Sequence, residues 1–523
     1  MTAIDSIGLE ILRRRFEALV AELGAVVGKL ARSTAIRENR AYSVAILDGH
    51  GGVVAIDNPL HLGLMTGGAR CALDRFRYDM REGDVVLLGD AHAGGSRCQD
   101  LMLMAPISVD GSTVLQIAAR AEMPDLGGEL IGSVNPAARE VWAEGVPVPP
   151  LKLWREGHQV RDVQASLLMN TRFPDQVEGN LEALLAAMTL GSGRIQRLAA
   201  DQGVEAVLAA AAHSQDYAER RARALLAGWG EGEASVRREP AAGEGAGPVV
   251  AATVAIAAGS VSVDLGASGP ELRSALNASA TSTAAAVATA VSAVLGPEVP
   301  VNGGLLRLIE LRTAAGTVVD ASFPSAVSCG HVYLSSLIVE LVGTALAELA
   351  GTSGGAPACE RSIVVVRPEA AGEQAPVDLA PFAIAGCSGA EGRDGWGAPH
   401  VFSRSLMPSA EEWEGQAEIA VRGIELVRDS AGPGRWRGAP GLAVELHLRG
   451  GGEVTSLLFG DRIELGDTDS GPRRLRLLFK GGAGYGDPRQ RDREAVRADV
   501  RDGLVSSAEA KAAYGLAVEE EAA

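Results

Sequence analysis

The sequence predicts a mixed α/β (α+β) fold of several layers, with two main domains, an N-terminal amphipathic helix and a C-terminal helical tail. Apolar residues recur at steps of three and four along the first 32 residues, which is the period of a helix lying on a core. Segments that alternate in polarity and are separated by glycine-rich turns follow, as expected for strands. A chain of 523 residues is also long enough for two or three domains.

The N-terminal segments predict a helix, a hairpin, a helix and a strand in turn. The amphipathic helix covers residues 6–32. The residues SVAILDGHGGVVAI alternate in polarity and turn at DGHGG, which predicts a β-hairpin. Thr66-Gly67-Gly68 then opens a short helix through Phe76, and VVLLGD follows as a buried strand.

A second hairpin is predicted where DLMLMAPISV and STVLQIAARAE flank Asp110-Gly111, a strong turn signal. If Val109 pairs with Ser112 across the two-residue turn, Asp100 and Glu122 are one position away from being directly opposite. We therefore expect both carboxylates at the open end of the hairpin.

This open end is predicted to be an acidic corner. Asp90 ends the preceding strand and joins the corner if that strand pairs alongside, while Asp125 follows Glu122 by three residues. The sequence therefore gathers Asp90, Asp100, Glu122 and Asp125 around Arg97.

The stretch GEGEASVRREPAAGEGAGP, rich in Gly, Glu and Pro, is the best candidate for a domain boundary. It follows a region predicted to be helical over residues 175–230. It divides the chain into an N-terminal α/β domain (1–235), a second α/β domain with Gly-rich loops (236–485) and a C-terminal helical tail (486–523).

The second domain begins with the alternating residues VVAATVAIAAGSVSVDL, and a long helix of small residues at 279–295 follows. Further strands are predicted up to about residue 480, including IELRTAAGTVVDA and AEIAVRGIELVRD. The tail carries the signals of two helices, which are Asp492 as N-cap, Gly503 as C-cap, and Ser506 with Glu509 as a capping box.

Composition excludes several classes of partner. The net charge of −18, without a stripe of Lys and Arg, argues against nucleic acid and against an anionic membrane surface. The five cysteines are scattered and form no CxxC pair, so neither a disulfide framework nor a structural zinc site is indicated. The first residues lack the pattern of a signal peptide. We expect a soluble, cytoplasmic protein.

Common cofactor and nucleophile motifs are missing from the sequence. None of the Gly-rich pieces fits GxxxxGK[ST], or GxGxxG between a strand and a helix, so we expect no nucleotide cofactor bound in those ways by this chain. No GxSxG elbow occurs. The remaining candidates are single residues.

Three histidines and one cysteine have two interpretations each. His61 precedes a helix and could act as a base, although a lone histidine there is more often a hydrogen-bonded structural residue; His331 and His400 are weighed in the same way. Cys98 could be a thiol activated by Arg97, but a buried, inert cysteine is favoured.

The loop GDAHAGGSRCQD, residues 89–100, combines the signals of a metal site and of an anion site. Aspartates and His92 are metal ligands, and glycines beside a charged group are typical of anion binding. However, Arg97 puts a permanent cation where a metal ion would need an electron pair.

A series of segments resembles the B-type subunit of the hydantoinase B/oxoprolinase family. They occur in the family's order from about residue 5 to 515, so together they are specific although each motif alone is weak. The segments are IGLEILRRRFEALVAELG, AIRENRAYSVAILDGHGGVVA, PLHLGLM, GDVVLLGDAHAGGS, ARAEMPDLGG, EVWAEGVPVPPLKL, SLLMNTRFPDQVEGNLEA, GRDGWGAPHV, DSAGPGRWRGAPG and GGAGYGDPRQRD.

The resemblance implies a division of labour between two subunits. Family members include ATP-dependent N-methylhydantoinases, 5-oxoprolinases, caprolactamases and acetone or acetophenone carboxylases. In them an A-type subunit of the actin-like ATPase class activates a carbonyl or amide oxygen of a small molecule, and the B-type subunit completes the reaction at a divalent metal. For this chain the resemblance implies an A-type partner that carries ATP and Mg, and in some carboxylase relatives a second B-type chain.

The resembling metal-ligand positions are largely changed here. The family's ligands are an aspartate, a histidine with an aspartate, and a further histidine. At the matching positions this sequence has Ala41, Arg97, Asp100 and Glu122, with Met123 beside Glu122 and Asp125 retained.

Two interpretations of these changes remain. Removing a dication from between carboxylates leaves unpaired negative charge, and an arginine restores neutrality and can bind two carboxylates. We therefore predict that Arg97 pairs with Asp100 and Glu122 in place of the metal. The competing interpretation is a rebuilt Mg²⁺ or Mn²⁺ site, and its ligands would be Asp90, His92, Asp100, Glu122 and Asp125.

Two functional hypotheses follow. In the first, the chain is the B-type subunit of an ATP-dependent cyclic-amide hydrolase or related carboxylase. Arg97 then stabilises an oxyanion, one of Asp100, Glu122 and Asp125 moves protons, and His61 is a candidate base. In the second, the chain is a catalytically degenerate B-type subunit with a structural or gating role in a heteromeric complex.

Overall fold

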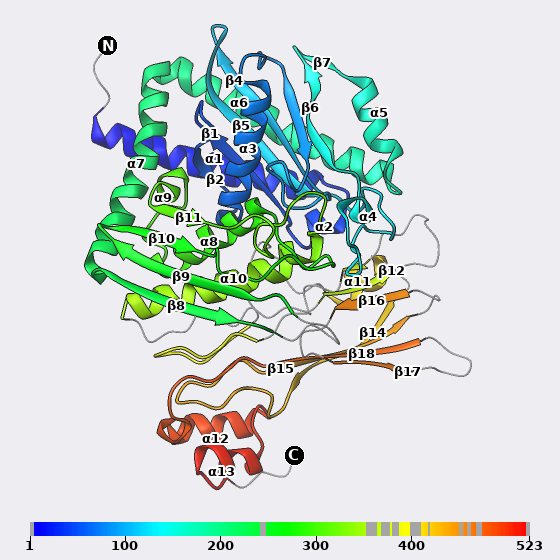
Figure 1. Ribbon diagram of the computed structural model, residues 1–523, viewed down its shortest axis with the longest axis vertical. Coiled ribbons are helices and arrows are strands. Elements are labelled where there is room, and N and C mark those ends of the chain that lie inside the picture. The colour runs from blue at the N-terminus through cyan, green and yellow to red at the C-terminus, as the bar shows by residue number, and fades with distance from the viewer. Residues whose placement is uncertain are drawn as a thin grey trace.

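The computed structural model describes residues 5–240, 247–351, 363–367, 377–378, 386–397, 409–416, 419–448, 453–457, 462–466 and 473–518. Within these residues the fold is mixed α/β, as the sequence predicts. Figure 1 shows helices and sheets of the first 350 residues stacked in the upper part, with the later sheets and two C-terminal helices below them. His400, weighed above as a site residue, lies outside the described residues.

A seven-stranded antiparallel sheet forms the centre of the N-terminal part among the described residues. Both predicted hairpins belong to it. In spatial order its strands are β2 (Val53–Ile56), β1 (Tyr42–Leu47), β5 (Ser112–Glu122), β4 (Asp100–Val109), β3 (Val85–Gly89), β6 (Val148–Arg155) and β7 (His158–Gln159).

Each face of this sheet is covered by helices. α1 (Ser6–Leu30), α6 (Pro174–Gln202) and α7 (Val204–Trp229) form one core with the residues of β4 and β5 that point to their side, such as Leu103. The alternate residues, such as Met102, face α3 (Leu62–Phe76) and a second core. The alternation of strand side chains thus separates two cores.

The β4–β5 hairpin has the predicted turn but contains a bulge. Val109 pairs with Ser112, and the register shifts between Ile107 and Ser108. The shift removes the one-position offset that the turn alone would give, so that Asp100 pairs directly with Glu122. The predicted meeting of the two carboxylates at the open end is confirmed.

The second core is built on a four-stranded sheet and two helices. The sheet comprises, in spatial order, β11 (Ile309–Arg312), β10 (Ser260–Asp264), β9 (Val250–Ala257) and β8 (Gly232–Arg238). The small-residue helix α8 (Ala280–Leu295) packs so closely on α3 that a Cβ on Gly63 would lie 2.5 Å from the Cα of Ala285. Residues from Ala45 to Leu346 contribute to this core, and the division into domains stays a prediction.

Helix α10 (Ser328–Leu349) was not predicted, because strands were expected throughout this part of the sequence. Most of its side chains are buried, so apolar residues lie on all its sides and no helical period marks it. Its length and its mean hydropathy of 1.6 would allow it to cross a membrane. However, 72% of its most apolar 18-residue stretch is buried inside the protein. It is a core helix.

The remaining elements confirm the C-terminal signals and correct one strand. Asp492 and Ser506 cap the last two helices, and Gly503 follows the first of them with a φ of 73°. Only Ile309–Arg312 of the predicted strand IELRTAAGTVVDA forms a strand of a sheet.

The other elements are α2 (Thr34–Arg37), η1 (Pro59–His61), α4 (Val141–Glu144), α5 (Arg161–Met169), α9 (Gly303–Leu306), β12 (Ile363–Arg367), β13 (Val377–Asp378), α11 (Ala410–Gln416), β14 (Ile419–Val427), β15 (Gly441–Leu448), β16 (Glu453–Leu457), β17 (Arg462–Gly466), β18 (Arg473–Phe479), η2 (Pro488–Gln490), α12 (Arg493–Arg501) and α13 (Ser507–Tyr514).

Candidate functional site

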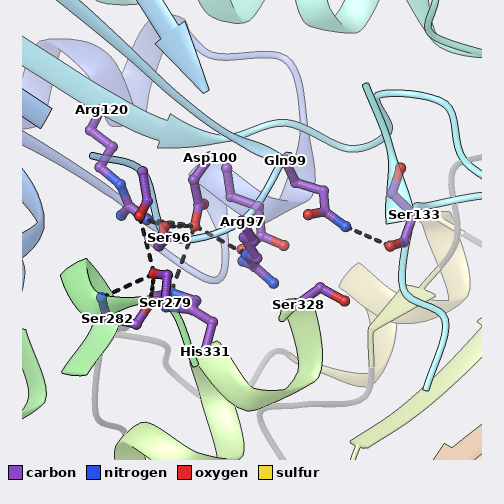
Figure 2. A network of polar contacts seen from close by, with 12 residues as sticks. Ser96, Arg97, Gln99, Asp100, Arg120, Ser133, Ser279, Ser282, Ser328 and His331 are labelled. Atoms are coloured by element: carbon purple, nitrogen blue, oxygen red, sulfur yellow. Dashed lines mark hydrogen bonds and ion pairs between the residues drawn. The ribbon is translucent and has the colours of Figure 1, made fainter. Parts of the chain in front are cut away.

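The candidate site lies where the β3–β4 loop, the open end of the β4–β5 hairpin and the first turns of α8 and α10 meet (Figure 2). The hairpin supplies Asp100 and Glu122, and the loop supplies Arg97. Segments more than 200 residues apart in the sequence therefore share one polar centre.

Asp100 is the centre of this site. Its Oδ2 accepts hydrogen bonds from the Ser96 hydroxyl at 2.6 Å, from Arg97 Nε at 3.1 Å and from Arg120 Nη2. Only 3% of the residue is exposed. Burial by itself would raise the pKa of Asp100, but the charges of Arg120 and Arg97 outweigh it and hold the pKa well below its usual value. The two guanidinium groups therefore favour the ionised form of Asp100.

The ion pairs predicted for Arg97 are both present. In addition to the contact with Asp100, Arg97 Nη2 lies 2.6 Å from Glu122 Oε2. The Arg97 side chain is 9% exposed and that of Glu122 is 21% exposed, so Glu122 is the more open end of the network. Two guanidinium groups and two carboxylates make the network neutral as a whole.

Arg120 is a site residue that the sequence interpretation missed. It is two positions before Glu122 on β5, and residues two apart on a strand point to the same face. The same alternation that brought Glu122 to Asp100 could therefore have identified Arg120.

His331, for which the sequence leaves a catalytic and a structural interpretation open, lies in the centre of the site. Its Nε2 is 3.6 Å from Asp100 Oδ2 and its Nδ1 is 2.8 Å from the Ser282 hydroxyl. Burial lowers the pKa of His331 well below its ordinary value, so the imidazole is neutral. The Ser–His–Asp order resembles a nucleophilic triad, but Ser282 is fully buried and cannot meet a substrate.

The first turn of α8 joins the loop to this centre. Ser279 is the N-cap, and its hydroxyl accepts the Ser282 N–H and donates to the carbonyl of Gly95. The start of the helix thereby fixes both the loop and the serine that holds His331.

Asp125 is separate from the Arg97 network. It is fully buried, and its carboxylate accepts N–H groups from the backbone of Gly127, Gly132 and Arg172. The Arg172 guanidinium adds an ion pair at 2.8 Å. Gly127 and Gly132 have φ values above 80°, a conformation that favours glycine. The Asp125 carboxylate therefore stabilises the loop that these two glycines shape, which is a structural role.

The other predicted residues are placed around the site rather than in the ion-pair network. Asp90 accepts the backbone N–H of His92, and the His92 ring is hydrogen-bonded to the carbonyl of Ser325. His61 is buried, with Nδ1 2.9 Å from the Ser43 hydroxyl, and it adds a small lowering effect to the pKa of His331. Burial raises the pKa of the Cys98 thiol, which supports the inert interpretation.

Glu144, at the end of α4, is a second residue that the sequence interpretation missed. It is completely buried, and its carboxylate accepts hydrogen bonds from Val327 and Ser328 at the start of α10. Burial raises the pKa of Glu144 to about 7, against the lowering effect of these hydrogen bonds and of the Arg97 charge.

This raised pKa predicts a pH-dependent stability. In the folded state Glu144 binds a proton up to a pH of about 7, whereas in the unfolded chain it ionises near 4.5. Protonated Glu144 therefore makes its full contribution to the free energy of unfolding below pH 4.5. This contribution, roughly 2–3 kcal/mol, is lost as the pH rises to about 7. Urea unfolding of the wild-type protein and of Glu144→Gln at pH 5 and pH 8 measures this effect. The difference in the free energy of unfolding between the two proteins should change with pH. A constant difference would refute the raised pKa of Glu144.

The donor set does not fit a metal ion at the family's position. A metal cation bound to Asp100 Oδ2 would lie beside the positively charged guanidinium groups of Arg97 and Arg120, which would repel it. Ala41 has no donor atom in its side chain. The part of the chain that the structure describes contains no group of three His, Cys, Asp or Glu side chains suited to a metal. The rebuilt metal site considered from the sequence is thus not assembled by these residues.

Comparisons with known proteins place the chain in a family. A family model described as hydantoinase B/oxoprolinase matches residues 5–468. Caprolactamase subunit beta of Pseudomonas jessenii is 27% identical, over 99% of this chain and 97% of its own length. The 5-oxoprolinase of Dictyostelium discoideum is 28% identical over 68% of this chain, which corresponds to only 28% of that longer protein.

Two solved structures are similar over almost the whole chain. The crystal structure of the ATP-dependent caprolactamase from Pseudomonas jessenii matches with a TM-score of 0.88 and 26% identity, covering 100% of this chain and 98% of its counterpart. A nucleotide-free structure of acetone carboxylase matches with a TM-score of 0.86 at 16% identity, covering 99% and 80%, and supports the fold alone. Because the family model matches residues 5–468 and the caprolactamase beta subunit is similar over nearly the full length of both chains, the chain belongs to the hydantoinase B/oxoprolinase family.

Proposed function

We propose that this chain is the B-type subunit of an ATP-dependent cyclic-amide hydrolase or related carboxylase of the cytoplasm. Its partner in this proposal is an A-type subunit that binds ATP and Mg. The similarity to a caprolactamase beta subunit over nearly the full length of both chains supports it, because that relative is a subunit of an ATP-dependent enzyme. The substrate class is a small molecule with an amide or ketone carbonyl that the partner activates.

One observation supports the proposed chemistry, namely the neutral network of Arg97, Arg120, Asp100 and Glu122. It includes three of the positions at which the sequence resemblance implies metal ligands. A guanidinium group can stabilise a developing oxyanion, which is one role of a catalytic metal ion. Arg97 is assigned this role because it is bound to Glu122 at the open end of the network. Asp100 stays ionised, so Glu122 is the better candidate to transfer a proton.

Loss of turnover in an Arg97 variant tests this proposal. The chain is copurified with the products of neighbouring genes, and the complex is assayed for ATP hydrolysis with hydantoins, lactams and ketones. Arg97→Met should lower kcat by about a hundredfold or more, the usual cost of removing an oxyanion donor. The control is Arg194→Met, which breaks an ion pair whose two side chains are 47% exposed.

A second candidate function is a structural or gating subunit without its own catalysis. It is favoured by the closed environment of Asp100, whose Oδ2 is bound by a serine and two arginines and is shielded from solvent. Wild-type turnover in the Arg97→Met complex would support this function and refute the catalytic role. A second B-type chain with intact ligands in the copurified complex would support it further.

Metal content gives an independent prediction. Two guanidinium groups hold the carboxylate that a metal would need, so elemental analysis of the purified chain should give far less than one transition metal ion per molecule. The measurement is repeated on Asp100→Ala as a control for adventitious metal. One metal ion per wild-type chain, lost in Asp100→Ala, would contradict the ion-pair interpretation.

A further inference from the structure

The first turn of α10 is capped by a residue from a distant segment. Val327, its N-cap residue, makes no side-chain hydrogen bond to the helix. Glu144 supplies the acceptor instead. Its Oε2 accepts the Val327 N–H at 2.9 Å, and its Oε1 accepts the Ser328 N–H at 2.7 Å and the Ser328 hydroxyl at 2.5 Å. Since the first N–H groups of a helix have no partners within it, α10 depends on this carboxylate for its start.

The turn that Glu144 caps carries a central residue of the site. His331 is three residues after Ser328 and contacts both Asp100 and Ser282. A Cβ on Gly330 would lie 2.0 Å from the carbonyl oxygen of Asn277, so the turn is already pressed against its neighbours and cannot move further inward. A change in the cap would therefore displace the turn and, with it, the His331 side chain that lies beside Asp100.

The segment before Glu144 is attached to the segment before α10. The backbone of Val141 donates to Pro324, that of Ala326 donates to Arg139, and Glu140 forms a bridge with Ser325. Residues 139–144 and 324–328 therefore run together, and the carboxylate is aimed at the helix by its own backbone. Figure 2 shows Ser328 at the start of α10 on the side where Arg97 lies, and the Arg97 charge acts on Glu144.

We propose that Glu144 is a positioning residue of the site, which holds the first turn of α10, and with it His331, against Asp100 and the arginine pair. Its catalytic consequence rests on the proposed function, whereas its effect on the helix does not. The residue comes from the motif EVWAEG, for which neither the ion-pair network nor the family's metal positions give a role.

Hydrogen exchange and thiol labelling of the purified chain test this role. Glu144→Gln keeps the size of the side chain but turns an amide N–H₂ group toward backbone N–H donors. At pH 8, where Glu144 of the wild type is ionised, the amides of the first turn of α10 and the thiol of Cys329, which is 1% exposed, should then react about ten- to a hundredfold faster in the variant, because hydrogen bonds to a charged acceptor are lost. Glu144→Asp, which keeps the charge, should restore part of the protection.

Two further variants separate positioning from general stability. Glu140→Gln changes an exposed carboxylate on the same segment and should leave the exchange of α10 unchanged. Ser328→Ala removes one donor and should give a smaller increase than Glu144→Gln; together with Glu144→Asp it decides the question if Glu144→Gln does not fold. Unchanged exchange in these variants would overturn the proposal, as would an increase spread evenly over the chain.

Turnover of the assembled complex gives the functional measurement. Glu144→Gln should lower kcat at least about tenfold with little change in KM, because a small displacement of a site residue affects the reaction more than binding. A wild-type complex without turnover on any substrate would refute the proposed function, while the exchange of α10 would still decide the role of Glu144.

Discussion

Asp100→Asn should lower the free energy of unfolding by about 3–5 kcal/mol, because it leaves two buried guanidinium groups with too little negative charge. Arg97 and Arg120 are 8% and 4% exposed, so water cannot replace the lost carboxylate. Chemical denaturation of the purified chain, followed by circular dichroism, measures the change.

Two comparisons make this result specific. Glu22→Gln removes a carboxylate from a surface ion pair whose side chains are each 47% exposed, and it should cost less than about 1 kcal/mol. Combining Asp100→Asn with Arg120→Met removes a charge of each sign, so the double variant should be less destabilised than the sum of the single variants. Equal effects of Asp100→Asn and Glu22→Gln would show that the network contributes no more than a surface pair.

Asp125→Asn should destabilise the protein by about 3–4 kcal/mol through a different set of contacts. The carboxylate accepts three backbone N–H groups and one guanidinium N–H with no exposure to solvent. An asparagine can satisfy only part of these donors and turns its own N–H₂ group toward the rest. Because the loop after Asp125 depends on these bonds, limited proteolysis should also cut near residues 127–132 in the variant first.

The matched control is Asp110→Asn at the tip of the β4–β5 hairpin. Asp110 is exposed and has a φ of 50°, a conformation that asparagine tolerates as well as aspartate. Its stability should stay within about 0.5 kcal/mol of the wild type. A small effect of Asp125→Asn on stability, combined with a large loss of turnover, would contradict the structural assignment and restore Asp125 as a candidate acid.

The parts of the site that could be predicted from sequence depend on local rules. A two-residue turn determines strand pairing, and this was sufficient to bring Asp100 opposite Glu122 and to predict the contacts of Arg97. Arg120 follows from the same alternation. The caps of the C-terminal helices were also predicted, because each cap is encoded within a few residues.

The parts that were missed depend on contacts between distant segments. Glu144 and Ser328 are 184 residues apart, and neither carries a local pattern that points to the other. His331 could not be assigned to the site while α10 was expected to be strands. Asp125 was grouped with Arg97 by its distance along the sequence, whereas its actual partner Arg172 is 47 residues away.

The bulge between Ile107 and Ser108 has a consequence for how the hairpin can vary in length. Val114 is the residue that lets the tip and the open end keep different registers. Because Val114 has no partner in β4, deleting it would make the ladder continuous and would leave Asp100 opposite Glu122. Inserting one residue beside Val114, with the turn and the bulge kept, would instead shift β5 by one position, and a one-residue slip turns every side chain to the opposite face. Glu122 would then leave Arg97, although the insertion lies about 25 Å away along the strand. A gain of one residue at this hairpin tip can therefore act as a charge substitution at the site, whereas the loss of one residue is absorbed by the bulge.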